Sequence, residues 1–334
     1  MKNKKTLIFF ATSLLLFIIV FFLALMVGRY NITFSNFFKA LFTDDTNVQT
    51  DRSVIFTLRL PRTIVAALTG IALSLSGLLY QETFQNKLTS PDLLGVSNGA
   101  GVGAALAIVI GLSTALISVL AFVVGVLTVV ATVVIAKFFR NGSSTILLLS
   151  GIIVGGLMSS FLSLIKYFAG NEVKLASITY WLMGSFANAK METVYILLPI
   201  VAVSTIFLLS ISWRINIVAL GREEAQTKGL NYTFYRYLII GIATLLTAST
   251  VAFSGTISWI GLVIPHIVRL IVGRNTRKTI PLCVTFGGLF MVVVDILSRT
   301  FTSEEIPLSA VTGLFGTIIF VIILFVKRGY YHEH

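Results

Sequence analysis

LIFFATSLLLFIIVFFLALMVG, residues 7–28, decides the class of fold, because a helix needs about 20 consecutive apolar residues to cross the hydrocarbon core of a bilayer. Three lysines precede this run, as they would precede the apolar core of a secretion signal. Such a core has roughly 7–15 residues and leads to a small-x-small cleavage site, and no such site precedes Arg29. We therefore expect an uncleaved first transmembrane helix.

Runs of this kind repeat along the chain as far as Val326, and the few charged residues are crowded into the gaps between them. Of the 334 residues, 56% are hydrophobic and 11% are charged, whereas an ordinary soluble domain is roughly 25% charged. A soluble core cannot hide so much apolar surface. The pattern predicts an all-α, polytopic membrane protein with about ten transmembrane helices. They are expected near residues 7–28, 54–80, 93–111, 114–136, 145–168, 191–211, 236–253, 257–273, 279–298 and 308–326.

Lysine and arginine residues predict the orientation in the membrane. With an even number of spans both termini lie on one side, and placing them in the cytoplasm satisfies the positive-inside rule. The outer side then receives fewer basic residues, including Arg29, Lys39, Arg52, Arg59 and Arg62. The cytoplasmic side receives Lys2, Lys4, Lys5, Lys137, Arg140, Arg214, Arg222, Lys228, Arg236, Arg274, Arg277, Lys278, Lys327 and Arg328. The net charge of +12 is thus explained by topology, because the basic residues form short clusters and not the stripe or arm of a nucleic-acid-binding protein.

The sequence shows no pattern of residues typical of catalysis or metal binding. Cys283 is the only cysteine, and His266, His332 and His334 share no helical ligand spacing. The sequence contains neither a G-x-G-x-x-G nor a G-x-x-x-x-G-K-[ST] phosphate-binding motif. We therefore expect no metal, no cofactor and no ATPase site, so the energy for any transport has to come from elsewhere.

Small residues spaced four apart predict close helix packing, because they let two backbones approach where no hydrophobic effect drives association in lipid. These pairs are Gly99 with Gly103, Gly151 with Gly155, and Gly70 with Ser74. The glycine-rich stretch 95–103 has a second interpretation as a kinked segment that lines a pathway, because its polar and flexible positions have to face protein or water.

Two arginines flank a proline at the outer mouth of the second span, in Leu58–Arg62 (LRLPR). Arg59 and Arg62 have two interpretations. One is that they snorkel into the headgroups and anchor the end of the helix. The other is that they dock an acidic partner outside the membrane, because arginine forms rigid bidentate pairs with carboxylates.

Two polar segments lie on the predicted cytoplasmic side. Residues 81–95 (QETFQNKLTSPDLLG) form a hinge in which Pro91 excludes a continuous helix. Residues 215–235 form the longest polar interruption on this side and predict a short charged helix that ends at Gly229. The second segment is interpreted either as a solvated loop helix or as a platform for a cytoplasmic motor.

A fourth region combines residues 254–269 with ionisable groups of the next span. Asp295 and Arg299 stand one helical turn apart and are expected to pair. His266 follows a proline, which favours a kink. Ionisable groups at membrane depth pair, face protein or line a path, and a structural use is favoured over a proton relay because no chain of acids and histidines crosses the sequence.

These four regions resemble the permease subunits of ATP-driven importers for iron chelates and vitamin B12, the FecCD or BtuC-like family. The resemblance covers Leu7 to Val326. It is carried by LRLPR at 58–62, SPDLLGVSNGAGVG at 90–103, ALGREEAQTKGLN at 219–231 and SGTISWIGLVIPHIVRL at 254–270. The family commonly has Asn-Pro-Leu in the hinge, whereas this chain has Lys87 in place of the proline.

The resemblance implies a type II importer fold in one transmembrane domain, residues 1–334, in which 215–235 is the coupling-helix loop, with both termini cytoplasmic. It implies a bacterial cell membrane protein with three partners: a second, identical or related permease, a cytoplasmic ATPase dimer and an extracytoplasmic binding protein. Carried over by resemblance are docking residues Arg59, Arg62 and Arg299; coupling residues Gly221, Arg222, Glu223, Ala225, Gly229 and Leu230; and gate residues Asn86, Leu88, Ser143, Ser144 and Thr145.

The expected function is passage of a substrate through a bundle that a separate ATPase switches between outward-open and inward-open states. A ferric siderophore is the expected cargo because most relatives carry such chelates, and heme and cobalamin remain open. Two other classes of protein are weighed against it. One is a secondary transporter driven by an ion gradient through Asp295, His266 and Arg299, and the other is an intramembrane enzyme.

Overall fold

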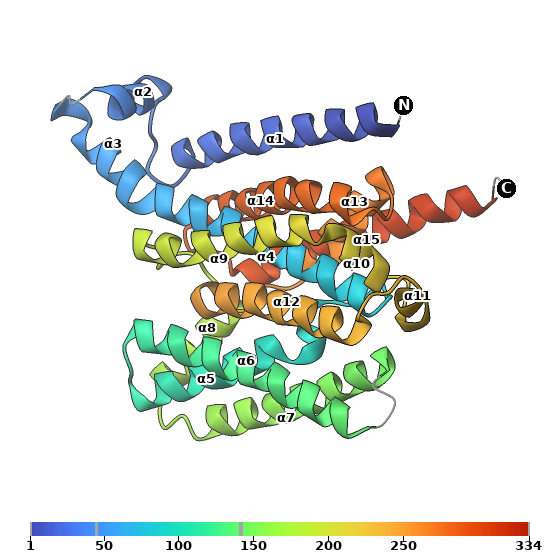
Figure 1. Ribbon diagram of the computed structural model, residues 1–334. Coiled ribbons are helices and arrows are strands. Elements are labelled where there is room, and N and C mark those ends of the chain that lie inside the picture. The colour runs from blue at the N-terminus through green and yellow to red at the C-terminus, as the bar shows by residue number, and fades with distance from the viewer. Residues whose placement is uncertain (1, 44–45, 140–142, 333–334) are drawn as a thin grey trace.

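The computed structural model describes residues 2–43, 46–139 and 143–332, and within these ranges the secondary structure is helical throughout (Figure 1). The helices lie alongside one another in a bundle. The two ends of the chain and α11 (Arg222–Thr227) lie at one end of it, and α2 (Phe34–Phe42) lies at the other. Arg140 and His334, both considered in the sequence analysis, lie outside the described residues.

Seven helical stretches in the described part are long and apolar enough to cross a membrane. They are α1 (Lys2–Met26), the continuous stretch Gln49–Thr83, α6 (Thr114–Phe138), α7 (Ser144–Tyr167), α9 (Met191–Ser210), α12 (Tyr232–Ser254) and α14 (Thr276–Thr300). Three shorter apolar helices are α5 (Val96–Ile110), α13 (Ile260–Val272) and the Leu308–Ile323 part of α15 (Leu308–His332). Each predicted span coincides with one of these helices, so the all-α, polytopic class is confirmed. The number of crossings and the side of the termini stay predictions.

The stretch Gln49–Thr83 is built from α3 (Gln49–Ser53), a π-helical segment η2 (Val54–Arg59) and α4 (Leu60–Thr83). The other elements are η1 (Thr46–Val48), η3 (Pro91–Leu94), α8 (Glu172–Met183) and α10 (Ser212–Val218). Of the short helices, α2 begins after Thr33, whose hydroxyl accepts a hydrogen bond from the backbone amide of Asn36. Hydropathy did not indicate α2 or α8, because both are shorter than a membrane span.

The span predicted at 93–111 begins later than expected. Pro91 opens the short helix η3, and Gly95 then takes a positive φ of 81° that ends it. Because this left-handed conformation is one that glycine adopts at little cost, the chain turns there and α5 starts only at Val96.

Helix α4 lies at the centre of the bundle and packs against α9, α12, α13 and α14. The most apolar window of Gln49–Thr83 is 89% buried. A Cβ atom added at Gly70 would lie 2.1 Å from the carbonyl oxygen of Gly287, and one added at Gly77 would lie 1.8 Å from that of Gly261. No side chain fits between these backbones, so small residues are required at these crossings.

The small residues found in pairs in the sequence pack as predicted, with one exception. A Cβ atom added to Gly99 would lie 2.0 Å from the hydroxyl oxygen of Thr128. One added to Gly103 would lie 2.4 Å from a backbone carbonyl oxygen, and one added to Gly151 would lie 2.2 Å from a different backbone carbonyl oxygen. Ser74 approaches α14 closely enough to donate a 2.8 Å hydrogen bond to the carbonyl oxygen of Cys283. The predicted packing role is therefore confirmed for these residues but not for Gly155, where an added Cβ would meet its nearest heavy atom at an ordinary 3.5 Å.

Replacing Gly77 by leucine is expected to destabilise the bundle, because the first added carbon already overlaps the Gly261 carbonyl group and two helices must separate. Overpacking of this kind costs about 1–3 kcal/mol, which thermal unfolding of the purified protein in detergent would register as a lower melting temperature. Gly156→Leu is the matched control, because no heavy atom lies within 4 Å of a Cβ added there. Equal melting temperatures of the two variants would contradict the packing argument.

Candidate functional site

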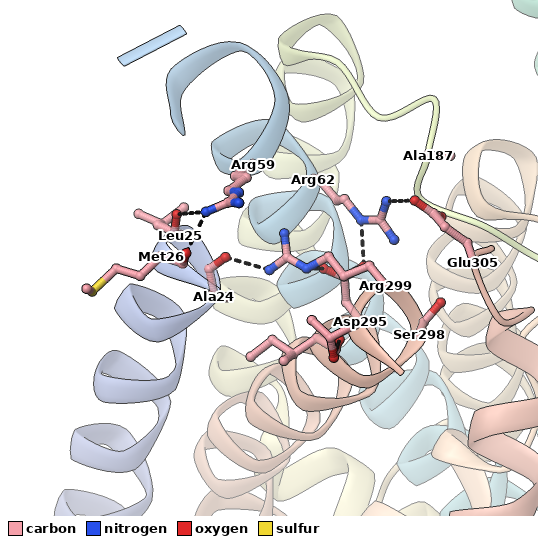
Figure 2. A network of polar contacts seen from close by, with 12 residues as sticks. Ala24, Leu25, Met26, Arg59, Arg62, Ala187, Asp295, Ser298, Arg299 and Glu305 are labelled. Carbon is pink, nitrogen blue, oxygen red and sulfur yellow. Dashed lines mark hydrogen bonds and ion pairs between the residues drawn. The ribbon is translucent and has the colours of Figure 1, made fainter. Parts of the chain in front are cut away.

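A network of charged side chains lies at the end of the bundle where α1 ends and α4 begins (Figure 2). Arg62, in the first turn of α4, donates from Nε to Oδ1 of Asp295 at 2.7 Å and from Nη1 to Oε1 of Glu305 at 2.5 Å. Asp295 belongs to α14, whereas Glu305 lies in the connection to α15. One guanidinium group therefore joins three segments of the chain.

Two further arginines complete the network. Arg299 lies one turn after Asp295, with its Nε 3.5 Å from Oδ2 of that carboxylate, so the pair expected from the spacing is confirmed. Its Nη2 also donates to the carbonyl oxygen of Ala24 at 2.5 Å. Arg59 donates to the carbonyl oxygens of Leu25 at 3.0 Å and Met26 at 2.6 Å. Both arginines therefore satisfy carbonyl groups at the open end of α1, where no further helical turn supplies donors.

These three arginines are buried. Arg59 is 5% exposed, Arg62 is 9% exposed and Arg299 is 6% exposed. Carboxylates and carbonyl oxygens of the same chain surround them, and their docking of an acidic partner stays a prediction. Among the described residues, Nη2 of Arg62, Nε of Arg299 and Oδ2 of Asp295 are buried without a hydrogen-bond partner, so both arginines retain an unused donor.

A second buried ion pair lies near the opposite end of α4. Nη1 of Arg269, in α13, donates to Oε1 of Glu82 at 2.7 Å. The sequence analysis did not include this pair. The usable signal was a carboxylate at the end of one apolar span and an arginine within another, since charges at membrane depth are normally paired. His266 is buried and packs beside the ring of Phe320, with 5.7 Å between the ring centroids.

The hinge after α4 begins with a residue in an uncommon conformation. Gln85 has a φ of 54°, in the left-handed region that a residue other than glycine seldom occupies. The backbone amide of Leu88 then donates to the side-chain oxygen of Asn86 at 3.0 Å, and Leu88 is 60% exposed. Asn86 and Leu88, the predicted gate residues, therefore form a compact turn with an apolar side chain left uncovered.

Asp92 connects the end of the hinge to α5. Its carboxylate accepts a hydrogen bond from the hydroxyl group of Ser97. Burial raises the pKa of the Asp92 carboxyl above its ordinary value, and the hydrogen bond from Ser97 opposes part of that rise. An added Cβ at Gly151 of α7 would lie 2.2 Å from the carbonyl oxygen of Leu93. The second half of the hinge is thus packed tightly on α7.

The other predicted gate segment precedes α7. Ser143 caps this helix, because its hydroxyl oxygen accepts the backbone amide of Ile146 at 3.2 Å. Ser143 and Thr145 are exposed, and Ser144 is partly exposed. Within the described ranges no hydrogen bond joins these three residues to Asn86 or Leu88, so a joint gate stays a prediction.

The predicted coupling helix is present as α11, but its residues face two directions. Ala225 is fully buried and Leu230 is 8% exposed, and both belong to the main hydrophobic core. They anchor α11 to the bundle, and their role in coupling stays a prediction. Arg222, Glu223 and Gly229 remain exposed.

Gly221 begins α11 with a φ of 106°, a conformation that favours glycine. A Cβ atom added to Gly221 would lie 2.8 Å from Nε2 of Gln85. The side chain of the hinge residue therefore lies directly against the start of α11. This contact, which sequence spacing did not indicate, brings the predicted coupling segment and the predicted gate segment together.

The chain is similar to known proteins over most of its length. The model of the FecCD transport family matches residues 16–326. The molybdate import system permease protein MolB of Haemophilus influenzae is 36% identical over 331 residues, which cover 98% of both chains. The cobalamin import system permease protein BtuC of Halobacterium salinarum is 34% identical over 83% of this chain and 74% of the relative. A probable iron chelatin transport system permease protein of Helicobacter pylori is 34% identical over 83% of each chain.

Solved structures are similar over most of the chain. An inward-facing conformation of a putative metal-chelate type ABC transporter superposes with a TM-score of 0.86 at 34% sequence identity, covering 95% of this chain and 98% of the other. PsaBC from Streptococcus pneumoniae, in complex with a Fab, has a TM-score of 0.62 at 18% identity over 82% of this chain and 93% of the other, which is a likeness of fold.

Asp295→Asn is expected to destabilise the protein by about 3–5 kcal/mol, because it leaves Arg62 and Arg299 buried beside a neutral group. Thermal unfolding in detergent measures the loss, and adding Arg62→Met to the same chain should recover part of it. Glu305→Gln is the control. That side chain is 30% exposed, so its loss should cost less than about 1 kcal/mol. A larger effect at Glu305 than at Asp295 would contradict the proposed centre of the network.

Proposed function

Because this chain belongs to the FecCD transport family, we propose that it is the permease through which an ATP-driven importer carries a ferric siderophore across the cell membrane. Membership of this family makes the chain a multi-pass permease subunit of an ABC importer, in which separate subunits hydrolyse ATP. The assembly contains ATPase subunits and a second permease. We further propose one transmembrane domain, residues 1–334, with 215–235 as its coupling-helix loop.

The proposed cargo is a ferric siderophore, and three other cargoes are considered beside it. A ferric siderophore is supported by the iron chelatin permease among the relatives and by the metal-chelate type transporter among the solved structures. Molybdate is the second candidate, because the relative named for it aligns over 98% of both chains. Cobalamin is the third candidate: its relative covers 83% of this chain at 34% identity, as the iron chelatin relative does, but neither of the two solved structures is named for it. Heme stays an alternative from the family resemblance alone.

Deleting the permease gene should separate these cargoes. Cells are grown with a ferric siderophore as the sole iron source, or with limiting molybdate, and their metal content is measured by mass spectrometry. We expect iron uptake to fall severalfold and molybdenum content to stay unchanged. Lost molybdenum with normal iron would establish the second candidate, and unchanged contents of both metals would contradict both.

We propose that α11 receives the motion of the ATPase through its exposed residues Arg222 and Glu223, whereas the buried Ala225 and Leu230 hold the helix on the bundle. The observation that carries this proposal is the contact between Gln85 and Gly221, because it joins α11 to the hinge that contains Asn86 and Leu88. A displacement of α11 would push directly on the hinge. Strained residues such as Gln85 are common in segments that switch between conformations.

Replacing Gln85 by glycine is expected to uncouple transport from ATP hydrolysis in the reconstituted importer. Glycine accepts the positive φ, so the hinge keeps its conformation but loses the side chain that meets Gly221. Basal hydrolysis should persist while the substrate transported per ATP falls severalfold. The variant Gln85→Asn also tolerates this conformation and carries a shorter amide side chain, so its transport ratio should fall in between. An unchanged transport ratio in Gln85→Gly would contradict the proposed contact route.

For the outer surface, we propose that acidic residues of the binding protein compete with Glu305 for Arg62, because Glu305 is its more exposed partner and Nη2 of Arg62 is an unused donor. Removing the competitor with Glu305→Gln should tighten docking up to about fivefold. Docking to permease in nanodiscs can be measured at low and high salt, because salt screens such pairs. Glu304→Gln is the control, since it removes an exposed neighbouring charge. Equal effects of both variants would contradict specific competition.

A further inference from the structure

A groove of about 540 Å³ runs between α6 and α12. Its α6 wall is a row of valines that includes Val126, Val130 and Val134, and its α12 wall includes Gly241 and Leu245. No heavy atom lies within 4 Å of a Cβ added at Gly241. The glycine therefore widens the groove, in contrast to the glycines of α4, which allow two backbones to touch.

The hydroxyl group of Thr244, which lines the groove, already forms its hydrogen bonds within the protein. The hydroxyl of Thr244 donates to the carbonyl oxygen of Ile240 at 2.8 Å and shares a 3.0 Å hydrogen bond with the hydroxyl of Tyr80. The interior of the groove therefore offers little hydrogen bonding to an occupant. An apolar chain is the group that such a surface accommodates without loss.

A cation stands at one end of this apolar surface. Lys137, near the end of α6, is exposed, and its ammonium group lies 5.0 Å from the centroid of the Tyr237 ring near the start of α12. Within the described part of the chain no carboxylate forms an ion pair with Lys137. The positive-inside rule places this end of both helices at the cytoplasmic surface, where anionic headgroups attract basic residues.

The dimensions of the groove also restrict its occupant. The lining extends along α6 from Phe122 to Lys137, which is roughly 22 Å at 1.5 Å per residue. An acyl chain from one leaflet can therefore lie along the groove over its whole depth in the membrane, because one leaflet contains roughly 15 Å of hydrocarbon. A helix with its side chains is about 10 Å wide, whereas this groove lies between two helices that already contact each other, α6 and α12. A single acyl chain is much thinner than a helix.

We propose that this groove is a binding site for one anionic phospholipid of the cytoplasmic leaflet. An acyl chain lies between α6 and α12, and the phosphate group meets the Lys137 ammonium beside Tyr237. The proposal depends on the protein's residence in a membrane and is independent of its cargo and of its coupling to an ATPase.

Native mass spectrometry of the purified, delipidated full-length chain tests the site. Phosphatidylglycerol and phosphatidylethanolamine with identical acyl chains are added separately, and the first bound lipid is quantified. Lys137→Gln should weaken binding of phosphatidylglycerol about fivefold and that of phosphatidylethanolamine much less, because the ammonium of its headgroup offsets the charge of the phosphate. Gly241→Leu fills the groove without meeting a neighbour, so it should weaken binding of both lipids.

Matched controls remove the same groups elsewhere. Lys166→Gln removes a lysine from α7, and Gly156→Leu adds the same side chain at an open position of that helix; neither should change binding of the first lipid. Equal losses in Lys166→Gln and Lys137→Gln would overturn the proposal, because the attraction would then be diffuse.

A measurement on the unmodified protein avoids dependence on the folding of the variants. Phosphatidylglycerol with a photoreactive acyl chain should label peptides that contain Val130, Val134 or Gly241. Labelling spread evenly over the lipid-exposed helices would overturn the site. A disulfide between two copies carrying Val134→Cys would also overturn it, because a second protein chain would then cover the groove.

Discussion

The direct contact of helix backbones around α4 is the constraint on which the rest of the structure depends. In a bilayer the apolar side chains of a helix gain little by leaving lipid for protein, so the helices are held by close packing and by polar contacts. Gly70 and Gly77 provide that packing against α14 and α13. Because α4 also carries Arg62 at one end and Glu82 at the other, its position determines the geometry of both charged clusters.

The two clusters hold α4 to different neighbours. The network around Asp295 joins it to α14 through Arg62 and, by way of Arg299, to α1, whereas the Glu82–Arg269 pair joins it to α13 at the start of the hinge. A buried ion pair of this kind is weak evidence for stability. Removing only one of its partners is nevertheless strongly destabilising, because the other charge stays buried without compensation. Such pairs favour a small number of discrete arrangements, which is what a transporter that alternates between two states requires. Each partner can then act only by favouring one arrangement through its own contacts.

Sequence patterns predicted the spans and the glycine crossings because hydropathy and small-residue spacing are local signals. The Asp295–Arg299 pair was predictable for the same reason, since one helical turn separates the two residues. Burial of Arg59, Arg62 and Arg299 was not, because the sequence does not show which carbonyl and carboxylate groups meet them. The inward orientation of Ala225 and the contact between Gln85 and Gly221 depend on how α11 docks on the bundle, which joins segments that are distant in the sequence.

We propose that this chain provides a passive pathway whose opening is driven by its ATP-hydrolysing partners. Solute accumulation in sealed vesicles tests this most directly, with the permease reconstituted either alone under a proton or sodium gradient or with its ATPase, binding protein and ATP. The account predicts accumulation only in the complete assembly with ATP. Accumulation against a gradient in vesicles that contain the permease alone would contradict it and would identify an ion-coupled transporter.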